Sequence, residues 1–310
     1  ESSDPRWREL ERRVVLSQYV MAVNEAGSLP PQESGLVNNG WYGKYHYEMI
    51  WWHCAHYALW NRWELASEMM RVFTDNLGVF RRKAAAQGYA GVRWPKTIGD
   101  HAWWEWPLET TALLIWQQPH PIFYAELEYR LRPTRETLEK WRDVVFGTAD
   151  FMASYAHYDA VRDRYVLGYP LQVVGESADP RTTINPAFGL SYWRTGLRLA
   201  QQWRVRLGLP EKREYDEVLR KLSPLPVEEG VYVSWENIER MWTSYNWEHP
   251  ALVGAYGMLP GDGVDIPTLR RTLAKVHAEW TRGETWGGDF PILALCAARL
   301  GALELAVASL

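Results

Sequence analysis

The sequence of 310 residues predicts an all-α fold, in which about twelve helices pair into hairpins and close into an (α/α)6 toroid or barrel. Segments with apolar residues at helical spacing follow one another with few strand-like segments between them, so their apolar stripes must pack on one another. Short turns alternate with long Trp-rich loops, and this alternation predicts that the loops gather at one rim. No fixed period of the solenoid type is present, which argues against stacked helical repeats.

The expected helices combine apolar residues at helical spacing with Gly or Pro near their ends. The first, at residues 9–26, stops at Gly27. The others are expected at residues 40–62 (free of helix breakers after Gly43), 65–86, 110–116, 122–130, 135–155, 183–207, 211–221, 251–256, 267–280, 291–300 and 303–310. Pro186 must lie in the first turn of its helix, because proline interrupts a helix interior.

Three segments lack the helical pattern. Residues 88–107 are too rich in Gly, Pro and Trp to be regular, and long aromatic loops on a compact domain are usually functional. Residues 158–167 alternate weakly and predict a short hairpin, and residues 229–246 predict short strands or loop. Tryptophans recur at Trp41, 94–106, 235–247 and Trp286, as expected if all these loops feed one central cavity of a single domain, residues 1–310.

The composition restricts the function classes. With 47% hydrophobic and 23% charged residues, the chain can bury a large core. A net charge of −4 gives no electrostatic case for a nucleic-acid partner or an anionic membrane. The chain has 19 Trp and 17 Tyr against 7 Phe, a bias typical of aromatic surfaces that must also form hydrogen bonds. An aromatic-rich core is the alternative explanation. The oligomeric state is not predicted.

Other features bear on the cellular location. The two cysteines, Cys54 and Cys296, have apolar and aromatic neighbours and are expected as buried free thiols, although a disulfide stays open. No apolar run approaches the roughly 18 residues that a membrane span needs. The N-terminus lacks both a signal-peptide pattern and an initiator Met, so we expect a processed or trimmed chain. The compartment stays open, with the periplasm or secretion after processing as one possibility.

The densest polar and aromatic segment, GWYGKYHYEMIWWHCAHYALWNR at residues 40–62, predicts the wall of a sugar pocket. Core helices use aromatic residues sparingly, whereas sugars stack their C–H faces on rings and bind donors and acceptors through hydroxyls. The residues concerned are Lys44, His46, Glu48, Trp51, Trp52, His53 and His56. His53 and His56 stand at i,i+3, but no complete ligand set accompanies them, so we expect neither a metal nor another cofactor.

Glycosidic bond cleavage needs two carboxyl groups, one on each side of the bond. Glu176, in VVGESADPRTTINP, follows an apolar run in a loop, and burial there would raise its pKa towards the range of a general acid. An exposed loop Glu or a helix cap is the alternative. Asp289, in TWGGDFP, is the second candidate, although Asp before an apolar helix is also a normal N-cap.

Weaker candidates surround these two. Asp100 and Glu105 belong to the Trp-rich loop, and Glu48 stands among aromatics, where it could bind a sugar hydroxyl. Gln118 and His120 belong to a polar cluster that either lines the pocket or caps a helix. No GxSxG, P-loop or GxGxxG context is present, which excludes the commonest hydrolase and nucleotide-binding motifs.

Four segments in this order resemble the catalytic domain of the six-hairpin glycosidases, near glycoside hydrolase families 65 and 95. They are GKYHYEMIWWHCAHYALWNR, LIWQQPHPIFYAELEYR, GESADPRTTINPAFGLSYW and WGGDFPILALCAARLGALELAVASL, and the resemblance covers about residues 9–310. It implies an (α/α) barrel and inversion of configuration, with water or phosphate as the nucleophile. It is fairly specific for the superfamily and silent on the substrate.

The resemblance also implies residue roles. Glu176 falls in the segment that carries the general acid, and WGGDFP resembles a tryptophan–acid motif that would make Asp289 the water-activating base. The Glu48 region matches the sugar-holding motif only loosely. The expected substrate-binding residues are those that stack on sugar or bind its hydroxyls: His46, Glu48, Trp51, Trp52, His53, Trp94, Asp100, Trp104, Gln118 and His120.

Two departures and three alternatives stay open. Relatives usually carry an N-terminal β-sandwich that this sequence lacks, so we expect a trimmed chain or a minimal version with a more open pocket. Gly189 stands where a larger residue is expected, which suggests altered specificity. The leading hypothesis is an inverting hydrolase that acts on an oligosaccharide or glycan end. A glycoside phosphorylase, a polysaccharide lyase using Tyr245, Arg93 or Arg181, and a non-catalytic carbohydrate-binding protein are the alternatives.

Overall fold

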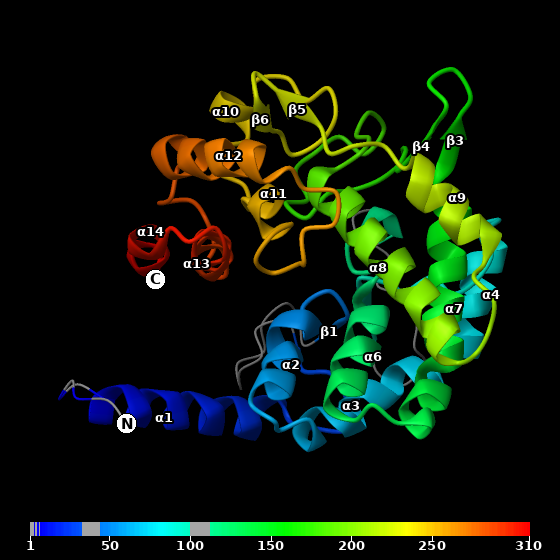
Figure 1. The fold of residues 1–310 in the computed structure, drawn as a ribbon, viewed down its shortest axis with the longest axis horizontal. Helices are drawn as coiled ribbons and strands as arrows, with labels where there is room; N and C mark the ends of the chain where they lie inside the picture. The colour runs from blue at the N-terminus through cyan, green and yellow to red at the C-terminus, as the bar shows by residue number, and fades with distance from the viewer. Residues whose placement is uncertain (1–2, 4, 6, 33–43, 100–111) are drawn as a thin grey trace.

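The computed structural model describes residues 3, 5, 7–32, 44–99 and 112–310, and over these ranges the chain is mostly helical (Figure 1). This confirms the prediction of an all-α fold. The helices are α1 (Trp7–Glu25), α2 (Ile50–Leu59), α3 (Glu64–Asp75), α4 (Leu77–Ala86), α6 (His120–Leu131), α7 (Arg135–Tyr155), α8 (Ala187–Arg206), α9 (Arg213–Lys221), α10 (Met241–Ser244), α11 (Ala251–Gly254), α12 (Ile266–Glu279), α13 (Asp289–Arg299) and α14 (Leu303–Ala308).

Short antiparallel strand pairs accompany the helices within the described ranges. They are β1 (Tyr45–His46) with β2 (Thr97–Ile98), β3 (His157–Asp159) with β4 (Arg164–Val166), and β5 (Val227–Glu228) with β6 (Val231–Tyr232). The β3–β4 pair confirms the hairpin predicted at residues 158–167, with Tyr158 opposite Tyr165. The segment predicted as short strands or loop, 229–246, contains β6 and α10, and β5 directly precedes it.

The helices are arranged along a curve around the middle of the molecule (Figure 1). Helices close in sequence pack on one another, as in α6 on α7, α7 on α8, and α13 on α14. Helix α6 also contacts α2 and α8, which brings the N-terminal and central parts of the chain together. Helix α1 instead projects away from the other helices at the bottom of the view, and of its residues Glu25 is the one that is buried.

Local capping explains where several helices begin. Thr134 accepts a hydrogen bond from the N–H of Thr137, so α7 begins at residue 135, as predicted. Asp265 caps α12 in the same way, through the N–H of Thr268. Helix α8 begins at residue 187, later than the predicted residue 183, because Pro186 is extended, with a ψ of 131°.

Among the predicted helices that differ from the structure are those at 65–86 and 40–62. The segment at 65–86 is two helices, α3 and α4, because Asn76 leaves the helical region, with φ −110° and ψ 9°, and its side chain bonds back to the carbonyl of Val72. The described part of 40–62 is helical from residue 50 to residue 59. Before it, the β1 pairing and the bond from the N–H of Tyr47 to the carbonyl of Lys96 hold the backbone extended.

Many tryptophans serve the core. Trp63, Trp94, Trp141, Trp193 and Trp203 are fully buried. The indole N–H groups of Trp193 and Trp203 donate to the carbonyls of Met152 and Leu138, which joins α8 to α7. Part of the tryptophan content therefore stabilises helix packing, as the core alternative proposed, and part of it faces cavities.

Cys54 and Cys296 are both free and buried, as expected, and no disulfide joins them. In the part of the chain that the structure describes, no helix has the length and apolar character needed to cross a bilayer.

Candidate active site

A cavity of about 440 Å³ lies where α2, the segment between β4 and α8, the segment before α11 and the start of α13 meet. Its volume is in the range of small-molecule sites. Glu176 and Asp289, the two predicted catalytic residues, both line it, as do Glu48 and Trp52. With His53, the structure thus brings five of the sequence candidates to one place, although the outermost are more than 200 positions apart along the chain.

The backbone at Glu176 has an uncommon conformation. Its φ is +61°, in the left-handed region that side chains with a Cβ rarely adopt, at a cost of about 1–2 kcal/mol. The Gln172 amide fixes this loop by donating to the carbonyls of Glu176 and Ala178, at 3.2 and 3.0 Å. Backbone strain of this kind is frequent at functional sites. It orients the side chain in a direction that a relaxed loop would not give it.

Lys96 links two of the cavity carboxylates. Its ammonium group binds Glu176 directly and lies 3.2 Å from Glu48 Oε1. Burial lowers the pKa of Lys96, but the charges of Glu48 and Glu176 raise it more, and the net shift is upward. The lysine therefore stays charged. The other oxygen of Glu48 accepts a bond of 3.1 Å from the Trp116 indole N–H, so this carboxylate is held from two sides.

Asp289, which is buried, forms a pair with His249, which is only partly buried. His249 Nδ1 lies 2.7 Å from Asp289 Oδ1, and the backbone N–H of Trp286 donates to Oδ2 at 3.0 Å. Burial lowers the pKa of His249, but the hydrogen bond and negative charge of Asp289 reverse the effect, so that the net shift is upward. The N-cap alternative for Asp289 does not hold, because Asp289 is the first residue of α13 and Gly288 is its N-cap.

Glu248, the neighbour of His249, is the fourth carboxyl group of the region. It is 5% exposed, and its Oε1 has no hydrogen-bond partner within the described part of the chain. Burial, reinforced by the negative charges of Glu176 and Asp289, raises the pKa of Glu248 to about 7. A carboxyl group in this range is protonated in a large fraction of molecules at neutral pH, as a general acid must be.

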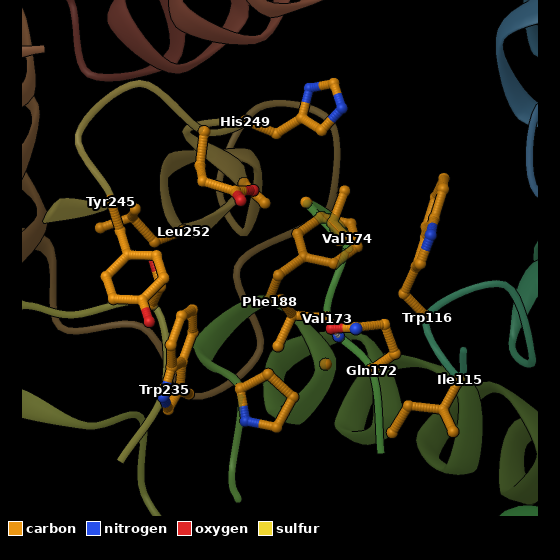
Figure 2. A pocket seen from close by; sticks show the side chains of 16 residues that line it. Ile115, Trp116, Gln172, Val173, Val174, Phe188, Trp235, Tyr245, His249 and Leu252 are labelled. Carbon is orange, nitrogen blue, oxygen red and sulfur yellow. Dashed lines mark hydrogen bonds between the residues drawn. The ribbon is translucent and has the colours of Figure 1, made fainter. Parts of the chain in front are cut away.

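A smaller chamber of about 30 Å³ adjoins the main cavity (Figure 2). Trp116, Phe188 and His249 line both spaces, and Glu248 lines the chamber. Figure 2 shows Trp116, Phe188 and Trp235 around it. Gly189, noted in the sequence as unexpectedly small, also lines it. A Cβ at position 189 would stand 2.9 Å from the Pro186 ring, so the glycine permits the tight start of α8.

Not all predicted sugar-binding residues reach the main cavity. Glu48, Trp52 and His53 line it, and His53 Nδ1 also lies 3.4 Å from Glu25 Oε1. His46 and Trp51 are not among its lining residues: His46 lies in β1, bonded to the Lys44 carbonyl, and Trp51 packs on Phe123 and Trp52. Asp100 and Trp104 lie outside the described residues.

Three further predicted binding residues are part of the core, which corrects their assignment. Trp94 is fully buried and donates to the Thr148 hydroxyl. Gln118 is fully buried against the backbone of Trp94, and it both accepts from the Trp94 N–H and donates to the Trp94 carbonyl. His120 lies between Tyr192 and the carbonyl of Glu48. The sequence alone could not distinguish these residues from residues that line a cavity. The same residue types form hydrogen bonds to buried backbone groups in a core and to ligands in a cavity.

His120 nevertheless supports the site. Its Nε2–H donates to the Glu48 carbonyl at 2.9 Å, which leaves Nδ1 to accept from the Tyr192 hydroxyl at 2.8 Å. Burial lowers the pKa of His120 to about 3, so the ring stays neutral and keeps this pattern of bonds. The neutral ring therefore fixes the backbone at Glu48 from behind the cavity.

Sequence reasoning missed Lys96, Glu248 and His249 as site residues. The signal was present, since Lys96 directly follows Trp94 and Pro95, and the pair Glu248–His249 follows Trp247 in a Trp-rich loop. Each is a charged residue inside an aromatic segment. Among the described residues, no cluster of His, Cys, Asp and Glu has the form of a metal site.

Comparisons with known proteins give structural likeness only. No family model matches the chain, and no curated protein matches it. A solved structure described as a kojibiose phosphorylase from the human microbiome matches with a TM-score of 0.69 and 9% identity, over 93% of this chain. The chain spans 44% of the length of that protein.

A protein described as a glycosidase, solved in its wild-type form and as a single-residue variant, matches with a TM-score of 0.65 and 15% identity. These matches cover 97% of this chain and 82% of the other chain. The likenesses and the helical architecture together show that this chain has an all-α barrel fold like that of these proteins.

Proposed function

We propose that the protein is a glycosidase that removes a terminal sugar from an oligosaccharide or glycan with inversion of configuration. The observation that carries this proposal is the meeting of Glu176, Asp289 and two tryptophans, Trp52 and Trp286, in one cavity. Carboxyl groups supply proton transfer, and indole rings bind the C–H faces of sugars. The fold is that of carbohydrate-active neighbours, which agrees with this chemistry but does not select among reactions.

In the proposed reaction, Glu176 protonates the glycosidic oxygen while the bond from this oxygen to the anomeric carbon breaks. Water attacks that carbon from the opposite face, and its proton passes to the Asp289–His249 pair. Asp289 orients the imidazole and increases its basicity by its negative charge. An inverting mechanism requires about 6.5–9.5 Å between the two carboxyl groups, to leave room for the water.

Lys96 and Glu48 would shape the sugar subsite. Lys96 fixes the direction of the Glu176 carboxyl group, and Glu48, held by Lys96 and Trp116, is in position to accept a hydrogen bond from a sugar hydroxyl. Trp52 and Trp286 contribute the aromatic surface.

Phosphorolysis is the second candidate, because a protein described as a kojibiose phosphorylase is among the structural neighbours. In that reaction phosphate would replace water as the nucleophile, and turnover would require phosphate. The two candidates share the acid, Glu176, and differ in the group that attacks the sugar.

The first test is to incubate the protein with a panel of oligosaccharides and aryl glycosides, with and without phosphate, and to follow product anomers by NMR. We expect an inverted sugar without phosphate, whereas a sugar phosphate formed only with phosphate would select the second candidate. The Glu176→Gln and Asp289→Asn variants should each lose roughly 10²–10⁴-fold in kcat. Glu228→Gln, on the exposed strand β5, is the control. Full activity of Glu176→Gln would reject the acid assignment.

A further inference from the structure

Glu248 is placed unusually close to the loop that carries Glu176. A Cβ at position 175 would lie 1.2 Å from Glu248 Oε2, so the carboxyl group of Glu248 occupies the space that a side chain at position 175 would fill. Gly175 directly precedes Glu176. The absent side chain at position 175 thus allows a second carboxyl group to pack against the backbone of the acid loop.

The main chain of Glu248 is fixed, while part of its side chain is free. Its backbone carbonyl accepts a bond of 2.6 Å from the Trp280 indole N–H, and its N–H donates to the carbonyl of Tyr245 at 3.2 Å. Oε1, by contrast, is buried and has no partner within the described residues. A buried charged oxygen without a partner is costly, so this position favours a protonated carboxyl group or a bound water.

The groups that face Glu248 belong to three parts of the chain. Glu176 approaches from the segment before α8, and Asp289 from α13. His249 is its neighbour along the chain, and its positive form offsets part of the negative charge. Lys96 lies beyond Glu176 and binds that carboxylate, not Glu248. Glu248 therefore faces two carboxyl groups, and their negative charges together with its burial favour its neutral form.

The chamber beside Glu248 is large enough for a water molecule that could carry a proton. Its volume of about 30 Å³ exceeds the roughly 10–15 Å³ that one water needs. Glu248, His249 and the Gln172 and Ser234 side chains are the polar groups around it, and the other lining residues are mostly apolar. A water in this chamber would have Glu248 as a partner and would complete its unsatisfied oxygen.

We propose that Glu248 and Glu176 form a coupled carboxyl pair that holds one proton, with Glu248 as the reservoir that resupplies the acid, a role that rests on the glycosidase function proposed above. After Glu176 has given its proton to the leaving oxygen, it is a carboxylate. The proton on Glu248 passes through water in the chamber and in the adjoining cavity, which Glu176 lines, to the Glu176 carboxylate, and Glu248 regains a proton from solvent. No oxidant or cofactor is needed, since one proton moves at each step.

A titration without substrate tests the pair directly. The protein is labelled with ¹³C-glutamate, and the carboxyl carbons are followed by NMR from about pH 4 to pH 9. We expect one carboxyl group to titrate near pH 7 and to vanish in Glu248→Gln. In Glu176→Gln the same group should titrate at lower pH, because a neighbouring negative charge has been removed. Glu228→Gln should leave this titration unchanged.

A second variant tests the geometry. Gly175→Ala forces the Glu248 carboxyl group away from the loop that carries Glu176. It should therefore lower the pKa of that carboxyl group, as Glu176→Gln does. A wild-type protein in which no carboxyl group titrates above about pH 6 would overturn the coupled pair, as would a titration that neither Glu176→Gln nor Gly175→Ala moves.

The pH profile of turnover is the functional measurement. In Glu248→Gln the residue at position 248 can neither ionise nor deliver a proton, so kcat should fall and its alkaline limb should no longer follow an ionisation near pH 7. An unchanged limb overturns the reservoir role. If the wild-type protein turns over no glycoside while the NMR titration shows coupling, then the glycosidase assignment fails and the carboxyl pair stands, so that the two failures are distinguishable.

Discussion

Ionisation of Glu248 destabilises the folded protein. Its pKa is about 7 in the folded chain, against an ordinary value of 4.5. The raised pKa means that the stabilising form is the neutral one. Its contribution is fully present below pH 4.5 and is lost as the pH rises through 7, up to about 3 kcal/mol at about 1.4 kcal/mol per pH unit.

Replacing Glu248 with Gln should therefore stabilise the protein in a pH-dependent way. Glutamine resembles the protonated acid and does not ionise, so we expect little change at pH 5 and a gain of about 1–3 kcal/mol above pH 8. Urea unfolding of both proteins at the two pH values measures this. A gain of equal size at both pH values would attribute the effect to packing and not to charge.

The sequence located Glu176 and Asp289 but not Glu248 or His249. Glu176 follows a glycine in a loop, and Asp289 follows two glycines at the start of a helix, and such positions can be recognised locally. The properties of Glu248 depend on Gly175, Glu176 and Asp289, which are 40 or more positions away. Burial and charge coupling of this kind arise only when the chain folds, so local pattern cannot reveal them.

At the scale of elements, the turn at residues 88–92 follows α4 and positions α7 against that helix. Gly91 has φ +75°, and a Cβ there would lie 2.3 Å from both the Gly147 carbonyl oxygen and the Phe151 nitrogen in α7. The next residue, Val92, donates to the same Gly147 carbonyl at 2.8 Å. The backbone of Gly91 therefore contacts the backbone of α7 directly, and no flexible side chain lies between them that could move to make room.

Gly91→Ala should destabilise the protein by about 3 kcal/mol or more, because strain at positive φ adds to a clash with backbone atoms. Gly88→Ala is the matched control: Gly88 has φ +84°, but a Cβ there would meet nothing within 4 Å. The control should cost only about 1 kcal/mol. Chemical denaturation gives both values, and equal losses in the two variants would show that the α7 contact is unimportant.

The helices were predictable to different degrees. The helical pattern at residues 135–155 predicted the bounds of α7 correctly. The division of residues 65–86 at Asn76 was not visible, because a single Asn within a helical pattern breaks it only when its side chain turns back on the backbone. The strand β1 was missed because its partner, β2, is about fifty residues away in an irregular segment.

At the scale of the whole molecule, stability is unevenly distributed. Helices α6, α7 and α8 pack on one another and contain many of the fully buried side chains. Helix α1 exposes apolar residues, including Leu10, Tyr19 and Val23, and of its residues only Glu25 is buried. Helical stability comes mainly from tertiary packing of an apolar face, so α1 has little to hold it.

We expect α1 to open far more often than the rest of the fold. Its backbone amides should exchange with deuterium at least about 100-fold faster than those of α7, because opening α1 exposes little additional apolar surface. Hydrogen exchange followed by mass spectrometry measures both segments in one experiment. Protection of α1 equal to that of α7 would show that its apolar face is covered in solution.

The all-α barrel was the most predictable property of the chain, since the helical pattern runs through most of the sequence and depends little on any single residue. The single-domain assignment for residues 1–310 stays a prediction. The convergence of tryptophans on one cavity was only partly correct: Trp286 lines the main cavity and Trp235 its side chamber, while Trp94 is in the core. Side-chain direction decides between these roles, and it is set by packing.

The two buried thiols make the native protein a suitable background for site-specific labelling. Burial raises the pKa of both Cys54 and Cys296, the latter to about 12, so neither forms much thiolate at neutral pH. A single Val161→Cys substitution, at the 93% exposed tip of the β3–β4 hairpin, would react with a maleimide dye while the native cysteines stay silent. Reaction of those two thiols would then report the moment at which the fold opens.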